Sequence, residues 1–429
     1  MVMVTFLADD LTGGSDVLAQ AHAFGLDAAM VLDPARAKST QADVVGIAGP
    51  ARSLGGSAFD RVVREGLRAL APLNAQVLLY KICSTFDSSP TRGSIGRGIE
   101  LLREVFPDHG PFPVVPAQPF FGRYTAFGQH FGAFDGGVYR LDRHPVMSRH
   151  PSTPMHEADL RLVLASQFAS GQQPGSIDLT HHESGGFDRA WEQQLTGDHE
   201  AFVVDAVTED HLDRAAEQLW RRSPAVVVGS GGIMAALART RSRRLRRLTS
   251  TETASRGPVL VVSASASRTT GDQIRHAVAN GFDEVAIPPE CLSADPFGSG
   301  GWAEQVLELL KLRRDVVAHT ACGPDDPRLG VRPDLDASVV GSAIGLVAAE
   351  AARRGLTRDV VVAGGDTSSH ALAAAGAGQL RISEQFVTAG PICTTDEESA
   401  LAGCRLLLKG GQVGPADVFT RFVGQRRSQ

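Results

Sequence analysis

The fold is indicated most clearly by one stretch near the C-terminus, Val360-Val361-Val362-Ala363-Gly364-Gly365-Asp366-Thr367-Ser368-Ser369. The β-branched run at its start is typical of a strand that is buried on both faces of a parallel sheet. The alanine-rich segment after it predicts a helix. A loop that opens a helix presents free backbone N–H groups, which favour an anion such as phosphate. Glycine pairs at such turns also serve packing alone, so this stretch leaves both interpretations open.

The same arrangement, a short apolar strand that ends in a polar or glycine-rich cluster, recurs along the chain. Strands are predicted at about residues 2–7, 44–47, 77–80, 112–115, 202–205, 226–228, 259–262, 284–287, 316–318 and 405–408. Apolar residues at helical spacing lie between several of them, as over residues 338–354. The alternation predicts an α/β protein with mostly parallel sheets flanked by helices.

The length of 429 residues predicts two domains, because a single core rarely grows so large. The polar stretch at residues 249–257 is the predicted boundary, which gives domains over residues 1–248 and 257–429. Each domain is expected to contain a mostly parallel sheet, with the active site in the cleft between them. The arginine-rich run at residues 239–247 is interpreted as a solvated helix end before the linker.

Composition excludes several classes of protein. The net charge of −6 gives no reason to expect a nucleic-acid partner, and no apolar run approaches the length of a membrane span. Five cysteines without a CxxC pair favour a reduced, cytoplasmic protein over a disulfide framework or a zinc site. The pair His181-His182 has no third ligand at metal spacing and is interpreted as part of a loop. No metal ligands can be assigned, and a homo-oligomer is left open.

Polar side chains at the predicted carboxyl ends of the strands fall into two groups, and ligands bind at that edge of open α/β sheets. The first half supplies charged groups, which suit a small acidic substrate: Asp9, Asp10, Asp16, Arg52, Lys81 and Arg123. The second half supplies glycines, hydroxyls and one acid, which suit the phosphates of a nucleotide: Ser263, Ser265, Ser267, Gly364, Gly365, Asp366, Thr367, Gly410, Gly411 and Gly414.

Lysine is rare, since arginine fills most basic positions. Two of the four lysines, Lys81 and Lys409, stand at predicted strand ends among small polar residues. A compact ammonium there would bind a carboxylate or a phosphate. Chance placement on the surface is the alternative. The chain contains no GxxxxGK[ST] motif and no GxGxxG motif after a strand, which argues against a P-loop protein and a dinucleotide enzyme.

Six short motifs, in order along the chain, resemble those of the four-carbon acid sugar kinase family. They are Ala8-Asp9-Asp10-Leu11-Thr12-Gly13-Gly14-Ser15-Asp16, the segment 81–96, Val115-Pro116-Ala117-Gln118-Pro119 with Gly122-Arg123, the segment 263–273, Gly364-Gly365-Asp366-Thr367, and Lys409-Gly410-Gly411-Gln412-Val413-Gly414. The resemblance covers the chain from Leu7 to about Phe419. It implies an N-terminal sugar-acid-binding domain, a C-terminal nucleotide-binding domain, and transfer of the γ-phosphate of ATP to a hydroxyl of a small sugar acid, with Mg²⁺.

This resemblance guides the expected roles. Asp9 or Asp10 is expected to orient or deprotonate the acceptor hydroxyl. Substrate binding is expected from Asp16, Arg52, Lys81, Ser84 and Arg123. The glycine and hydroxyl loops, with Lys409, are expected to hold ATP.

The chain departs from the family pattern at four places. Cys83 stands where the family has an aspartate, Ser88-Ser89-Pro90 lengthens the loop after it, Ala264 replaces a glycine, and Gly410 replaces a serine. The spelling around Cys83 resembles the 3-oxo-isoapionate kinase branch and favours a keto or branched acid. D-Threonate or D-erythronate is the alternative substrate. A sensor that binds nucleotide and sugar acid without turnover is an alternative of another class.

Overall fold

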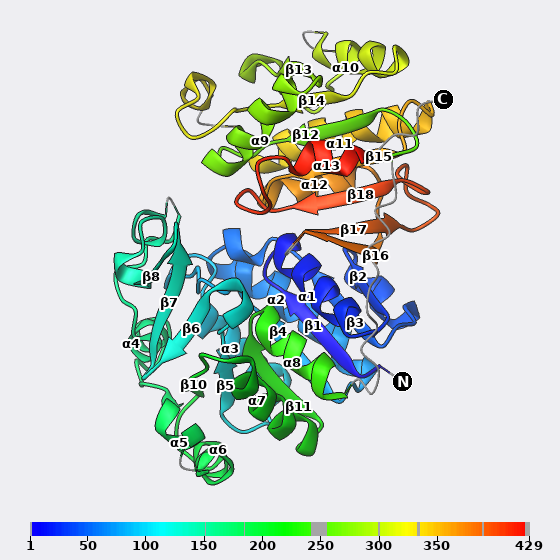
Figure 1. The fold of residues 1–429 in the computed structure, drawn as a ribbon. Helices are drawn as coiled ribbons and strands as arrows, with labels where there is room; N and C mark the ends of the chain where they lie inside the picture. Colours follow the sequence, from blue (N-terminus) through cyan, green and yellow to red (C-terminus); the bar gives the residue numbers. More distant parts are fainter. Residues whose placement is uncertain are drawn as a thin grey trace. The chain divides into compact units, whose positions relative to one another are not determined.

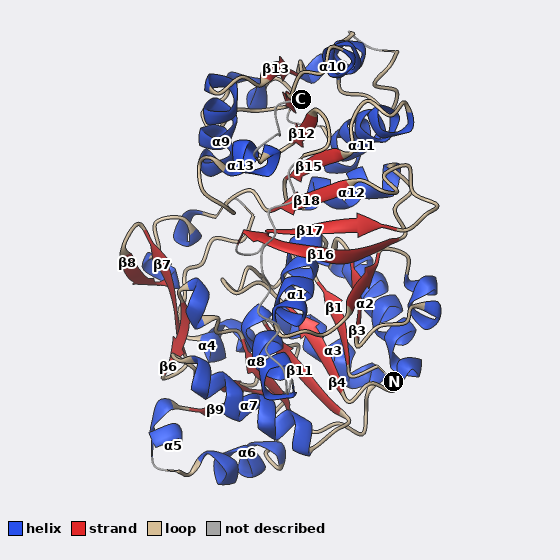
Figure 2. Ribbon diagram, turned by 45° about the vertical axis from the view of Figure 1, so that its right-hand side comes forward, coloured by secondary structure: helices blue, strands red, loops and turns tan. Residues whose placement is uncertain are grey.

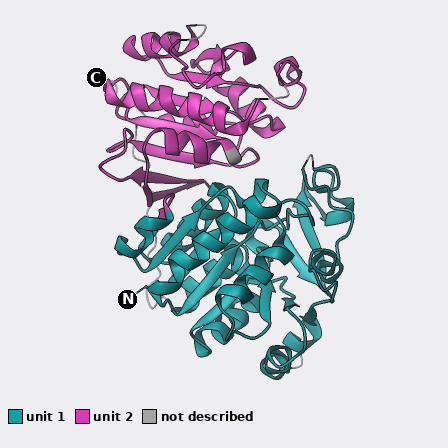
Figure 3. Cartoon of the chain, turned by 180° about the vertical axis from the view of Figure 1, so that it is seen from behind, with its two compact units in different colours: residues 1–29, 34–246 teal, residues 30–33, 247–429 magenta. Residues whose placement is uncertain are grey.

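The computed structural model describes residues 2–150, 152–183, 185–241, 255–298, 301–332, 335–387 and 390–424. The chain forms two compact units, one of residues 1–29 and 34–246 and one of residues 30–33 and 247–429 (Figure 3). Most of the predicted boundary stretch, residues 249–254, lies outside the described residues, as does the arginine-rich run beyond Arg241. The predicted α/β fold class is confirmed, because strands and helices alternate along both units (Figures 1 and 2).

Unit 1 contains the following elements: β1 (Val4–Ala8), α1 (Leu11–Ala23), β2 (Ala28–Val31, shared with unit 2), β3 (Val44–Ala48), α2 (Gly56–Leu70), β4 (Val77–Lys81), α3 (Ile95–Val105), β5 (Phe112–Val115), β6 (Arg123–Ala126), β7 (Gln129–Phe134), β8 (Gly137–Arg140), α4 (Leu160–Ala165), β9 (Gly175–Ile177), α5 (Leu179–Glu183), α6 (Phe187–Leu195), β10 (Ala201–Val204), α7 (Glu209–Arg221), β11 (Ala225–Gly229) and α8 (Gly231–Arg241). Short 3-10 helices include η2 (Ala51–Ser53) and η4 (Pro119–Phe121).

The main strands of unit 1 are parallel, in the order β3-β1-β4-β11-β5-β10-β9. Ala8 at the end of β1 pairs with Ala48 on one side and Lys81 on the other, and Lys81 pairs with Gly229. Parallel pairing therefore brings the carboxyl ends of four neighbouring strands to one edge. Helices α1, α7 and α8 pack together on one face of the sheet, and α2 and α3 lie on the other (Figure 2).

A second, three-stranded antiparallel sheet of β6, β7 and β8 was not expected from the sequence. Each of its strands is short and partly exposed, and glycines and polar residues obscure the alternation that identifies strands. The histidine pair was also misjudged, because His181 and His182 lie on helix α5 and His182 is buried. The interpretation of this pair as a loop is wrong.

Hydrogen bonds to the carboxylate of Asp205, which follows β10, connect the small sheet to the main sheet of unit 1. This carboxylate accepts hydrogen bonds from the backbone N–H groups of Phe127 and Gly128 in the β6–β7 turn. Beside this contact, Thr125 on β6 and Ala206 exchange two backbone hydrogen bonds of 3.0 Å. Because β6 begins at Arg123, this attachment determines where a predicted substrate-binding side chain lies.

Unit 2 contains the following elements: β12 (Val259–Ser263), α9 (Arg268–Ala279), β13 (Asp283–Ala286), α10 (Trp302–Lys311), β14 (Val316–His319), α11 (Ala337–Arg353), β15 (Asp359–Ala363), α12 (Asp366–Ala374), β16 (Gln379–Val387), β17 (Gly390–Thr395), β18 (Arg405–Lys409) and α13 (Val418–Val423). Its strand order is β13-β14-β12-β15-β18-β17-β16. The first five strands are parallel, whereas β17 runs antiparallel to both of its neighbours.

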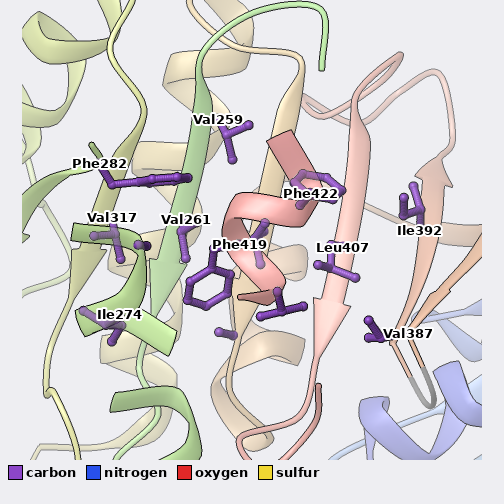
Figure 4. Packing of buried hydrophobic residues seen from close by; sticks show 14 residues of the cluster. Val259, Val261, Ile274, Phe282, Val317, Val387, Ile392, Leu407, Phe419 and Phe422 are labelled. Carbon is purple, nitrogen blue, oxygen red and sulfur yellow. The ribbon is translucent and has the colours of Figure 1, made fainter. Parts of the chain in front are cut away.

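The core of unit 2 explains why the residues of the Val360–Ala363 strand are apolar. Val361 and Ala363 face a cluster that also contains Val261, Phe419 and Phe422 (Figure 4). This cluster lies beneath α9 and α13, while α10, α11 and α12 pack together on the other face. Every residue of β15 is buried, as a continuous apolar run predicts for a central parallel strand.

Helices in the described part of the chain lack the combination of length and apolar character needed to cross a membrane. All five cysteines are free thiols.

Asp205 generates a prediction about pH. Burial raises its pKa to about 6, although the hydrogen bonds from Gly128 and Phe127 lower it. Between the ordinary aspartate pKa of 3.8 and the folded-state pKa of about 6, the folded state keeps a proton on Asp205 that the unfolded state has lost. This difference stabilises the fold at low pH, and the stabilisation is lost as the pH rises through 6. Asp205→Asn removes one acceptor and should lower the midpoint of thermal unfolding, but by less at pH 7.5 than at pH 5.0.

Calorimetry at the two pH values measures this difference. Asp135→Asn, in the exposed β7–β8 turn, is the matched control and should give the same shift at both. A penalty for Asp205→Asn that grows with pH would mean that the two N–H groups stabilise the ionised carboxylate more than burial destabilises it.

Candidate active site

Three loops at the carboxyl edge of the unit 1 sheet bring charged side chains together. Asp9 and Asp10 follow β1, Arg52 lies in η2 after β3, and Lys81 is the last residue of β4. Backbone hydrogen bonds hold these loops to one another, since the Asp9 N–H donates to the Lys81 carbonyl and the Arg52 N–H donates to the Asp9 carbonyl. These four residues, predicted separately from strand ends, therefore lie in one cluster.

Arg52 binds both neighbouring aspartates. Its Nη2 and Nε donate to Asp9 Oδ1 at 2.8 Å and Oδ2 at 3.1 Å, and its Nη1 donates to Asp10 Oδ2 at 2.7 Å. The other oxygen of Asp10 caps α1 by accepting from the Gly13 N–H at 2.6 Å. The Arg52 side chain remains 20% exposed, while those of Asp9 and Asp10 are 5% and 6% exposed. Of the three, Arg52 is the group that a ligand reaches most easily.

Two opposing effects set the pKa values of Asp9 and Arg52. Burial disfavours the charged form of each, and the ion pairs between them favour it. Burial raises the pKa of Asp9, Arg52 lowers it and Asp10 raises it again, with a net rise. Burial lowers the pKa of Arg52, but Asp10 and Asp9 together hold it well above its ordinary value. Arg52 is thus a permanent cation, and Asp9 is a more basic carboxylate than an exposed aspartate.

Lys81 lies deeper in the cluster and is buried. Its Nζ donates to the Ile82 carbonyl at 2.9 Å and lies 3.9 Å from Asp16 Oδ2. Asp16 in turn accepts from Gln118 Nε2 at 3.2 Å. Gly231, the first residue of α8, leaves the room this carboxylate needs, because an added Cβ would lie 2.0 Å from Asp16 Oδ2. Lys81 and Asp16 are therefore held at buried positions, whereas Arg52 is partly exposed.

Cys83 and Ser84 follow β4 beside this cluster. The Cys83 Sγ lies 3.0 Å from Thr85 Oγ1, and Thr85 Oγ1 donates to Asp87 Oδ1 at 2.9 Å. Burial and, to a smaller extent, Asp87 raise the pKa of the Cys83 thiol to about 11, although Arg52 opposes them. Cys83 is therefore a neutral, half-buried side chain near groups of both charges, and its place in the site stays a prediction.

Arg123 comes from the small sheet. Its Nη1 donates to three carbonyls, those of Phe121, Gly122 and Ala133, at 3.2 to 3.3 Å. Burial lowers its pKa, while Cys83 and Asp87 raise it, so the guanidinium lies within electrostatic reach of the Cys83 loop. Its buried Nε lacks a hydrogen-bond partner among the described atoms. An anion or a carbonyl oxygen would satisfy that donor.

Unit 2 assembles a different kind of site at the carboxyl ends of β12, β15 and β18. Ser267 caps α9 by accepting from the Thr270 N–H at 3.1 Å, and its hydroxyl donates to the Gly411 carbonyl. Thr270 Oγ1 donates to the same carbonyl at 2.7 Å. Position 411 is a glycine because a Cβ there would lie only 2.6 Å from the Ser265 Oγ. The β18 loop is thereby held against the start of α9.

Lys409 ends β18 and is buried, so the alternative of a chance surface lysine is wrong for it, as it is for Lys81. Its Nζ donates to the Gly410 carbonyl at 2.9 Å and to Thr270 Oγ1 at 3.1 Å. No carboxylate in the described part of the chain forms an ion pair with it, and burial lowers its pKa to about 7. A nearby phosphate would favour its charged form.

The remaining predicted residues of unit 2 lie along the same edge. Gly364 has a φ of 151°, and an added Cβ would meet Thr367 Oγ1 at 2.6 Å. By contrast, a Cβ at Gly365 would meet nothing within 4 Å, so open space lies over this backbone. Ser263 ends β12 and Gly414, with a φ of 86°, follows β18. The side chain of Asp366, the first residue of α12, lies outside the described part of the structure.

Comparison with known proteins agrees with this division. A family model described as a sugar-binding N-terminal domain matches residues 4–237, and one described as a nucleotide-binding C-terminal domain matches residues 260–419. The chain belongs to the four-carbon acid sugar kinase family. A 3-oxo-isoapionate kinase of Paraburkholderia graminis is 35% identical over 97% of this chain and 93% of its own length. A 3-oxo-tetronate kinase of Burkholderia multivorans is 29% identical over 97% of this chain and 96% of its own.

A crystal structure of a Haemophilus influenzae protein has the same fold as this sugar-acid kinase. The two superpose with a TM-score of 0.72 at 22% identity, over 98% of this chain and 99% of the other.

Sequence reasoning did not include several residues of this kinase in the site. Asp87 and Thr85 lie in the loop after Lys81, and a carboxylate two residues past a threonine at a strand end was the available signal. Gln273 was quoted in a motif but given no role, although its Nε2 donates to the carbonyls of Val413, Gly414 and Pro415 at 3.0 Å. His130, which contacts the Ser84 carbonyl, had no signal, because its strand was not predicted.

Proposed function

We propose that this protein is an ATP-dependent kinase that phosphorylates a hydroxyl of a small keto or branched sugar acid. The observation that carries the proposal is the Asp9–Arg52–Asp10 cluster at the carboxyl edge of unit 1, in a chain that belongs to a family of sugar-acid kinases. A substrate carboxylate is best bound by a permanently charged cation with N–H donors that are not already used in other hydrogen bonds. Arg52 meets both needs, because its side chain is still 20% exposed after both ion pairs form.

ATP is assigned to unit 2. The loops at Ser265, Gly365 and Gly411 combine hydroxyls, backbone N–H groups and the N-terminus of α9, a helix of 12 residues. The open space over Gly365 allows a phosphate to approach the backbone closely. Lys409 would supply a positive charge behind the β18 loop.

Mg²⁺ is expected to arrive with the phosphates of the nucleotide. The described residues contain no group of three or more His, Cys, Asp or Glu side chains able to hold a metal. The hydroxyls of unit 2 fit an ion that keeps several waters and is bound mainly by phosphate oxygens, which is the usual behaviour of Mg²⁺. When bound, this ion would neutralise charge on the phosphates.

The side chains of unit 1 would then bind and orient the acceptor. Arg52 and Arg123 hold the carboxylate and oxygen atoms of the sugar acid. Asp9 accepts the proton of the acceptor hydroxyl as its oxygen bonds to the γ-phosphorus, and the bond to the β-phosphate oxygen breaks to release ADP. We assign this role to Asp9 because burial raises its pKa above the ordinary value of an aspartate and because one oxygen of Asp10 already caps α1.

The substrate class follows from the neighbourhood of Cys83. A neutral thiol replaces a carboxylate beside Lys81 and Arg52, so the site has fewer acceptors for hydroxyls and more free positive charge for a keto oxygen. The 3-oxo acid named for the relative with 35% identity supports this choice. D-Threonate, named for a relative with 27% identity, remains the alternative substrate. The charged cluster in unit 1 argues against a sensor, which needs no base.

An ADP-release assay tests the proposed function and its substrate. The panel contains D-threonate, D-erythronate, their 3-oxo forms and branched 3-oxo acids, and we expect the highest kcat/KM for a keto or branched acid. Cys83→Asp restores a carboxylate and should lower this preference by about 10- to 100-fold. Cys291→Asp, at another half-buried free thiol, is the control and should leave the preference unchanged. A wild-type preference for plain threonate would refute the substrate assignment.

Asp9 and Asp10 can be separated by matched substitutions. Asp9→Asn removes the proposed base and should lower kcat by about two to four orders of magnitude, while ATP still binds. Asp10→Asn should have a smaller effect, because asparagine caps helices about as well as aspartate. Asp60→Asn, at a partly exposed carboxylate paired with Arg97, should leave kcat unchanged. Near-normal turnover in Asp9→Asn and Asp10→Asn would exclude both as the base.

The nucleotide assignment has its own test. Gly365→Val should abolish ATP binding in titration calorimetry, because the side chain fills the space over the loop. Gly330→Val is the control, since a Cβ there also meets nothing within 4 Å but lies outside the proposed site. Unchanged ATP affinity in Gly365→Val, with a normal unfolding temperature, would place the nucleotide elsewhere.

A further inference from the structure

His130 on β7 joins the two parts of the proposed sugar-acid site in unit 1. Its ring is fully buried, and both nitrogens have partners. Nε2 lies 2.8 Å from the Ser84 carbonyl oxygen, next to Cys83, and Nδ1 lies 2.9 Å from Thr125 Oγ1. The ring therefore connects the small antiparallel sheet to the loop after β4.

The chemistry of the partners assigns every proton in this chain of hydrogen bonds. The Ser84 carbonyl can only accept, so Nε2 carries the hydrogen. Burial lowers the pKa of His130 to about 4, so the ring is neutral at physiological pH and Nδ1 is an acceptor. The Thr125 hydroxyl must then donate to Nδ1. The Ser84 carbonyl thus selects the tautomer, and the Thr125 hydroxyl, which can donate or accept, binds the other ring nitrogen.

The strand that carries Thr125 also carries Arg123. The two residues are two positions apart on β6, and Thr125 pairs with His130 across the β6–β7 ladder. The backbone of Thr125 is held in turn by its two hydrogen bonds to Ala206. A shift of the Ser84 carbonyl relative to β6 would therefore break a buried hydrogen bond. The strand of Arg123 is thus linked to the Cys83–Ser84 loop through His130.

We propose that His130 is a positioning residue that sets the width of the sugar-acid site between Arg123 and the Cys83–Ser84 loop, and thereby selects which sugar acid fits. This inference rests on the proposed function, which assigns the sugar acid to this site. His130 itself is fully buried, so the proposed role is an indirect one. It acts through the Ser84 carbonyl on one side and the Arg123 strand on the other.

Two substitutions separate positioning from simple packing. His130→Phe keeps an aromatic ring of similar size but removes the donor to Ser84. It should raise KM for the preferred sugar acid by about 10-fold or more and reduce discrimination among acids in the panel, with KM for ATP unchanged. His130→Gln keeps an N–H donor and should recover most of the loss. Leu212→Ala in α7, also fully buried, controls for lower stability and should leave both KM values unchanged.

Hydrogen exchange gives a readout that does not require turnover. In His130→Phe, amides of residues 83–87 and 123–126 should exchange faster, while those of β9 should not change. If wild-type protein releases no ADP with any acid, the proposed function fails. The inference about substrate choice then fails too, even if hydrogen exchange shows that His130 holds the Ser84 loop to β6. If wild type is active but His130→Phe keeps normal KM values, normal discrimination and normal exchange, the inference about His130 alone is overturned.

Discussion

The charged site of unit 1 depends on the ion pairs between Arg52 and two buried carboxylates, those of Asp9 and Asp10. Bringing charges out of water costs several kcal/mol each, and this cost is offset only when pairing and hydrogen bonds are nearly complete. Arg52 achieves this with three hydrogen bonds to Asp9 and Asp10. Removing one partner of such a buried pair typically costs about 3 to 5 kcal/mol, because the other charge is left without compensation. The cluster therefore exists only while the loops after the neighbouring parallel strands β1 and β3 stay in register.

The two units offer different chemical groups to an anion. Unit 1 uses fixed side-chain charges, which discriminate by geometry and suit a small acid with few atoms to recognise. Unit 2 uses hydroxyls, glycine backbone and a helix start, together with the buried cation Lys409. Backbone donors follow a chain of phosphates without needing a separate side chain for each oxygen. This difference in chemistry agrees with the two domain descriptions that match the chain.

Much of this could be predicted from local sequence, and the reasons are physical. Buried parallel strands such as Val360–Ala363 are continuous apolar runs, and their ends are marked by glycine and polar residues. Since the carboxyl ends of parallel strands share an edge, Asp9, Arg52 and Lys81 could be grouped without coordinates. The strands β6 to β8 could not be predicted, because their stability comes from distant contacts, including those of Asp205 and Ala206. The proposal of Asp9 over Asp10 also needed the structure, because only the structure shows that Asp10 caps a helix.

The raised pKa of Cys83 has a consequence for redox chemistry. The thiolate is the form that oxidants and alkylating reagents attack. With its pKa at about 11, Cys83 carries almost no thiolate at neutral pH. The raised pKa, caused mainly by desolvation, favours the protonated thiol and so lowers its reactivity toward peroxide. At neutral pH, Cys83 should therefore react with oxidants and alkylating reagents more slowly than an ordinary exposed thiol.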